Sequence, residues 1–110
     1  MKTPISLIAA LLIASAAGVT AADVKEVWEK NCASCHGKDG RGETKAGKKA
    51  DVKDLNDAAY QASFTDDKML LQIKEGMKDK NGKEKMKPFG DKLSADEIKA
   101  LIRYVRAFKK

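Results

Sequence analysis

Apolar side chains recur at helical spacing in four stretches of the chain, and each stretch predicts a helix. The stretches are residues 23–31, 56–64, 65–76 and 94 to the C-terminus. The first places Val24, Val27 and Trp28 on one face. No stretch alternates between apolar and polar residues for long enough to predict a strand. The pattern therefore predicts an all-α fold, with three to five helices around one small core.

Residues from 94 onward carry the clearest helix signal. Ser94 and Glu97 have the spacing of a capping box, and Leu93 and Ile98 stand where a hydrophobic staple places its two members. The apolar positions that follow repeat with a period of 3.6: Ile98, Leu101, Ile102, Val105 and Phe108. This segment should form an amphipathic helix that packs on the core.

Two longer segments lack any periodicity and are expected to be loops. Residues 37–51 hold four glycines among charged residues, and residues 78–92 hold six lysines together with Pro88 and Gly90. We find no internal repeat and no linker, so one domain is expected.

The N-terminal 22 residues have the composition of a secretory signal. Lys2 precedes an apolar stretch at residues 5–17, and small residues follow as far as Ala22. The stretch is short for a membrane span, which needs roughly 17–25 apolar residues. We therefore expect cleavage after Ala22, a mature domain at residues 23–110 in the periplasm or another extracytoplasmic compartment, and no stable membrane insertion. The alternative is a retained anchor.

The composition excludes several kinds of site. The 110 residues include two Cys and one His, which is too few for a disulfide framework or for a zinc site built from Cys and His alone. The mature chain would have 88 residues, and domains of this size often need a staple such as a disulfide or a bound metal. We expect a cofactor to complete the core.

The two cysteines and the histidine lie together in Cys32-Ala33-Ser34-Cys35-His36. This is the C-x-x-C-H pattern of c-type haem attachment, in which two thiols bind one porphyrin and the next residue is an iron ligand. Three other interpretations compete with it. A thiol–disulfide oxidoreductase would need a βαβ context, a zinc site would need a carboxylate as fourth ligand, and the cysteines could form a structural disulfide.

Residues 23–110 as a whole resemble the class I, monohaem, bacterial c-type cytochromes. The likeness rests on a helix ending in NCASCHG, a Gly-rich loop, a central helix, the segment KMKPFGDKLS and the terminal helix DEIKALIRYVRAF. It implies the small cytochrome c fold around one covalent haem c, with thioethers to Cys32 and Cys35. It also implies that His36 and a Met near the last helix are the axial iron ligands.

Met86 is the predicted second ligand. Met69 and Met77 lie on the apolar stripe of a predicted helix, where core packing is the ordinary role of Met. Met86 instead lies in a polar loop ahead of Pro88, and it matches the ligand position of the family. Met77 is the main alternative. The loop differs from the common M-P-x-F form, because it has Met86-Lys-Pro-Phe89.

Two further expectations follow from the resemblance. Many relatives orient the proximal histidine with the carbonyl of a Pro that this chain lacks, so we expect a substitute acceptor within residues 50–53. Tyr60 could line the haem and reach a propionate, and simple core packing is the alternative.

Residues 78–92 carry six Lys against three acidic residues, so their charge is +3 within a chain of +6. We expect this segment to surround an exposed haem edge and to attract acidic redox partners; a merely solvated loop is the alternative. Lys and acidic residues interleave elsewhere, so a nucleic-acid partner is not expected. The Walker A-like run at 42–49 lacks its final Ser/Thr and a preceding strand.

The predicted function is therefore that of a soluble, monomeric electron carrier rather than an enzyme. The main alternative is a haem enzyme or gas-ligand sensor with an open sixth coordination site.

Overall fold

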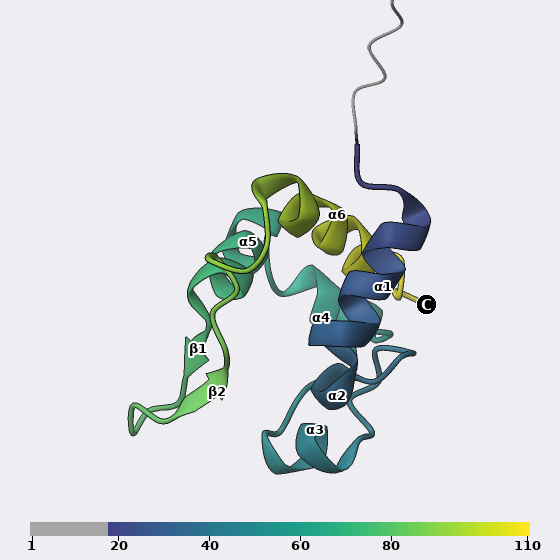
Figure 1. Ribbon diagram of the computed structural model, residues 1–110. Coiled ribbons are helices and arrows are strands. Elements are labelled where there is room, and N and C mark those ends of the chain that lie inside the picture. The colour runs from purple at the N-terminus through teal and green to yellow at the C-terminus, as the bar shows by residue number, and fades with distance from the viewer. Residues whose placement is uncertain (1–17) are drawn as a thin grey trace, which may run out of the picture.

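The structure, a computed structural model, describes residues 18–110 as six helices and one small hairpin (Figure 1). The elements are α1 (Ala21–Asn31), α2 (Ala33–His36), α3 (Lys45–Lys49), α4 (Ala58–Ala62), α5 (Asp66–Glu75), β1 (Met77–Lys78), β2 (Glu84–Met86) and α6 (Ala95–Arg106). The predicted helical fold is confirmed. The helix number is higher than expected because α2 and α3 are single turns that leave no hydrophobic periodicity.

Side-chain caps begin five of the six helices, all except α2. Ser94 and Glu97 form the predicted capping box of α6, and Thr65 caps α5. A second capping box, made by Thr20 and Asp23, starts α1 two residues before the predicted position. The helix therefore includes Ala22, the predicted cleavage point. Residues 1–17 of the predicted signal lie outside the described part of the chain, and its cleavage stays a prediction.

Helices α1 and α6 pack against each other around Trp28 (Figure 1). The ring of Trp28 lies 5.5 Å from that of Tyr104 and 5.1 Å from that of Phe108, measured between centroids. Trp28 therefore joins α1 to α6 through aromatic contacts. The buried indole N–H of Trp28 donates to the carbonyl of Gly37 at 3.0 Å, which also ties α1 to the end of α2.

The expectation of no strand is wrong for residues 77–86, which form an antiparallel hairpin. Met77 pairs with Met86, and Lys78 pairs with Glu84 across a bulge. The carboxylate of Asp79 accepts the N–H groups of Asn81 and Lys83 at 2.8 and 2.9 Å. Gly82, which has a φ of +79°, completes the turn. The hairpin projects from the end of α5 (Figure 1).

The chain after β2 returns to α5 through main-chain bonds. The N–H of Phe89 donates to the carbonyl of Ile73 at 2.9 Å, and that of Gly90 donates to Lys74 at 3.0 Å. Buried apolar residues of α1, α5 and α6 then close the core with Leu55, Phe89 and Leu93. Across residues 18–110, every helix is too short or too polar to cross a bilayer.

Candidate functional site

The Cys-x-x-Cys-His segment forms α2 and the residue before it. Cys32 ends α1 and begins α2, and its carbonyl accepts the N–H of His36 at 2.9 Å. Gly37 ends the turn with a φ of +80°, a value that favours glycine. Cys32 and Cys35 are partly buried and are not joined by a disulfide. Both thiols and the imidazole are therefore carried by one helical turn.

Helix α3, which lies within the loop predicted over residues 37–51, supports this turn. The hydroxyl of Thr44 donates to the carbonyl of Cys35 at 2.9 Å and accepts the N–H of Gly47 at 2.8 Å. Gly47 is buried, and a Cβ atom built on it would lie 2.2 Å from the Cys35 carbonyl oxygen. Residues 37–51 were expected to be a loop. They instead include a capped helix that fixes the backbone of the attachment segment.

An apolar cavity lies beside α2. Its empty volume is about 550 Å³, and this figure includes the open space at its mouth. Its walls come from α1, α5 and α6, from the residues around Leu55 and from the segment after β2. The lining residues are Trp28, Cys32, His36, Leu55, Phe64, Met69, Ile73, Met86, Phe89, Leu93, Leu101 and Val105. Most of these are also core residues, so the cavity occupies the centre of the fold.

His36 lies at this cavity in a form suited to metal binding. Burial lowers the pKa of His36, which keeps the imidazole neutral at pH 7. Neutral imidazole is the metal-binding form. Its Nδ1 atom is buried without a hydrogen-bond partner, so the acceptor expected within residues 50–53 does not engage it here. The ring lies 5.5 Å from that of Trp28, which limits its movement.

The Cys32 thiol is unlike that of a thiol–disulfide oxidoreductase. Burial, together with the nearby Cys35, raises the pKa of Cys32 to about 12. In redox catalysts the pKa of the attacking cysteine is instead lowered, to about 7 or below. In the described part of the chain, moreover, no three His, Cys, Asp or Glu side chains gather as a metal site would require. The thiol-redox and zinc interpretations thus lose support.

The three methionines of the described chain differ in their relation to the cavity. Met86 is half-buried at the end of β2 and lines the cavity. Met77, its partner across the hairpin, is 38% exposed and is not part of the wall. Met69 is only 5% exposed and also lines the cavity. Of the two alternatives to Met86, Met69 therefore has the better position, although the sequence favoured Met77.

Tyr60 lies outside the cavity wall. Its ring packs edge-on against that of Phe64, with 5.2 Å between the centroids, and Phe64 lines the cavity. Tyr60 therefore reaches the cavity wall through Phe64. Direct contact of Tyr60 with haem stays a prediction.

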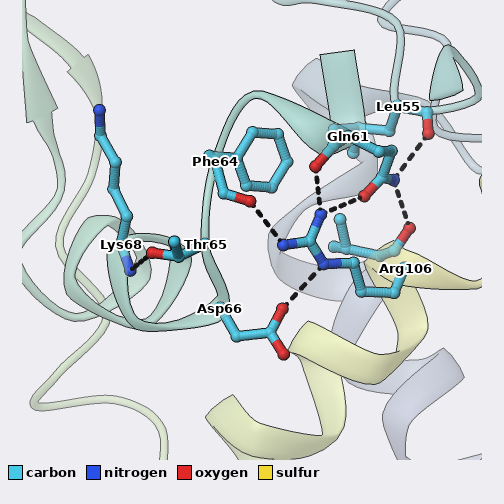
Figure 2. A network of polar contacts seen from close by, with 8 residues as sticks. Leu55, Gln61, Phe64, Thr65, Asp66, Lys68 and Arg106 are labelled. Atoms are coloured by element: carbon cyan, nitrogen blue, oxygen red, sulfur yellow. Dashed lines mark hydrogen bonds and ion pairs between the residues drawn. The ribbon is translucent and has the colours of Figure 1, made fainter. Parts of the chain in front are cut away.

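Two polar residues near this wall were missed by the sequence analysis. Gln61 is 2% exposed and donates to the main-chain carbonyls of Leu55 and of Val105 in α6. Arg106 binds Gln61 and the turn before α5 (Figure 2). Gln61 stands three residues before Phe64 and so on the same face of the helix predicted over residues 56–64. A polar residue on an inward face was the available signal. Arg106 had none, because it resembles any charged residue near a helix C-terminus.

These residues fit a haem. The cavity is apolar and central, two thiols and a neutral imidazole share one turn beside it, and a thioether stands on its wall. The buried Nδ1 of His36 has no hydrogen-bond partner, so no protein group competes for this nitrogen. A large flat apolar ring with a central metal would satisfy all of these features at once.

Comparison with known proteins gives the same result. Residues 19–105 match the family model described as cytochrome C oxidase, cbb3-type, subunit III. The chain is similar to the solved KustC0563 c-type cytochrome, with 36% identity and a TM-score of 0.68, over 78% of this chain and 96% of that one. A tyrosine-to-phenylalanine mutant of that protein gives 36% and 0.67, over 79% and 99%. No curated protein matches.

The family match covers most of the chain, and the structural likeness covers nearly the whole of the solved protein. Both agree with the attachment motif and with the cavity. The chain therefore belongs to this family of monohaem c-type cytochrome domains.

Proposed function

We propose that this chain is a soluble extracytoplasmic electron carrier whose haem iron has His36 and Met86 as its axial ligands. The family carries covalent haem c and transfers electrons, so the group and its general role are common to its members. The observation that carries the finer proposal is that the neutral imidazole of His36 and the thioether of Met86 line one apolar cavity. The predicted signal at residues 1–22 supports the extracytoplasmic location.

Each part of the chain would have a separate task. When bound, haem supplies reversible one-electron chemistry. Cys32 and Cys35 would hold it through thioethers, and His36 and Met86 would provide two uncharged ligands. A Met/His pair favours a raised reduction potential. Trp28, Leu101 and the other apolar wall residues exclude water, which also favours the less charged ferrous state.

The competing function is a haem enzyme or gas sensor with an open sixth site. The two functions differ in how the reduced protein responds to carbon monoxide. If Met86 occupies the sixth position, CO should bind the purified ferrous protein slowly and incompletely at neutral pH. Rapid, complete CO binding, measured by the change in the Soret band, would support the open-site alternative and contradict the carrier.

The lysine-rich hairpin supports an acidic redox partner. All six lysines of residues 78–92 are exposed, and the ion pairs found within residues 18–110 involve none of them. Leu71 on α5 and Met77 on β1 are exposed as well. A positive surface next to the strand that carries Met86 would guide an acidic partner towards the haem.

This docking surface predicts a salt-dependent reaction. Electron transfer to an acidic redox protein should slow as ionic strength rises, because salt screens exposed charges over roughly 10 Å at 0.1 M. Changing Lys80 and Lys83 to Glu should lower the bimolecular rate at low salt, and the difference should vanish at high salt. Stopped-flow measurements test this. Lys99→Glu on α6 is the matched control, and an equal loss there, or a flat salt dependence, would contradict docking at the hairpin.

A further inference from the structure

Three residues of the cavity wall have their main-chain carbonyls bound by side chains that lie outside the wall (Figure 2). The Nε2 group of Gln61 donates to the carbonyls of Leu55 and Val105, both at 2.8 Å. The Nη2 group of Arg106 donates to the carbonyl of Phe64 at 2.7 Å. Two polar side chains therefore hold three separate parts of one apolar wall.

The two side chains are also bound to each other. The Nη1 group of Arg106 donates to Oε1 of Gln61 at 3.0 Å and to the main-chain carbonyl of the same residue. Both amide hydrogens of Gln61 and its side-chain oxygen thus have partners, although the residue is fully buried. A buried polar network that is satisfied in this way fixes one arrangement of the groups around it.

Arg106 connects elements that are far apart in the sequence. It lies in the last turn of α6, and its Nε donates to the carboxylate of Asp66 at 2.8 Å, in the first turn of α5. Its guanidinium also lies 4.7 Å from the centre of the Phe64 ring. Phe64 is therefore held by its carbonyl and its ring together.

We propose that Gln61 and Arg106 are positioning residues that hold the Phe64 side of the cavity closed, and that they thereby control water access and the reduction potential of the haem. The proposal rests on the proposed function in one respect, that haem occupies this cavity. If the wall loosens, water can reach the group more easily. Water stabilises the more highly charged ferric state, so the reduction potential should fall.

The test uses the purified holoprotein and the variant Arg106→Lys. A lysine keeps the positive charge but cannot donate to Gln61, Phe64 and Asp66 at once, because it lacks the planar fork of arginine. We expect imidazole to bind the ferric protein about tenfold faster, the factor expected when a charge-assisted hydrogen bond is lost from the closed wall. The reduction potential should fall as well. Arg103→Lys, an exposed arginine of the same helix, is the matched control and should change neither.

A second variant, Gln61→Met, keeps the side-chain volume but removes every hydrogen bond of the side-chain amide. It should also raise the rate of imidazole binding and lower the reduction potential. Thermal unfolding is recorded for each variant. Variants that melt at lower temperature yet keep the wild-type potential and imidazole rate would show a purely structural role and overturn the positioning role alone. A wild-type protein that contains no haem by the pyridine haemochrome test would overturn the proposed function as well.

Discussion

Replacing Met86 with alanine should remove the sixth iron ligand, abolish the Met–iron charge-transfer band at the red edge of the ferric spectrum, and allow CO to bind the ferrous protein rapidly. The reduction potential should fall by on the order of 0.1 V, since the identity of axial ligands changes haem potentials over roughly 0.8 V. Haem attachment should persist, because Cys32 and Cys35 are untouched. Absorption spectroscopy and a spectroelectrochemical titration measure all three effects.

The two other methionines provide the controls. Met77 is exposed and outside the cavity wall, so Met77→Ala should leave the band and the potential unchanged. Met69 lines the cavity but lies within the buried face of α5. Its replacement by alanine should lower stability by about 2–5 kcal/mol through loss of core packing, and the band should remain. Loss of the band in Met69→Ala, with retention in Met86→Ala, would transfer the ligand role to Met69.

Gly47→Ala should destabilise the protein and reduce the yield of haem-containing protein. A Cβ at this position would lie 2.2 Å from the carbonyl oxygen of Cys35 and 2.6 Å from that of Gly42. Both neighbours are backbone atoms and cannot move aside alone, so α3 must shift away from α2. We expect a loss of about 2–3 kcal/mol in the free energy of unfolding. Helix propensity predicts the opposite sign, because alanine is the better helix former.

Gly82→Ala is the matched control for Gly47→Ala. Gly82 has a positive φ, but a Cβ there would meet no atom within 4 Å. Its substitution should cost only the backbone strain, about 1–2 kcal/mol, and should leave haem attachment unchanged. Urea unfolding and the ratio of Soret to protein absorbance measure the two effects. Wild-type stability and haem yield in Gly47→Ala would show that α3 does not position the attachment segment.

The helical elements were predictable because each carried a local signal. The capping box and the apolar stripe of α6 were both confirmed. The short helix α3 was missed, because Gly47 lies in its middle and it rests on the Thr44 cap and on a bond from the Thr44 hydroxyl to the carbonyl of Cys35. The hairpin at 77–86 did have a local signal that was not used. Asn81-Gly82 is a dipeptide typical of tight hairpin turns.

The site was predictable where chemistry is contiguous and less so where it depends on tertiary structure. Cys32, Cys35 and His36 form one motif, and the structure puts Cys32 and His36 in the wall of one apolar cavity. The roles of Gln61 and Arg106 depend on contacts across 44 or 45 positions of the chain. No periodicity or spacing reports such a contact. The exposed position of Met77 also depends on the hairpin, since the sequence placed it on the apolar face of α5.

The central claim is that one covalent haem has His36 and Met86 as axial ligands in an electron carrier. The most direct measurement is the absorption spectrum of the purified wild-type ferric protein at neutral pH. We expect a low-spin, six-coordinate spectrum that includes the Met–iron charge-transfer band. A high-spin spectrum without that band would contradict it and would favour the open-site enzyme or sensor.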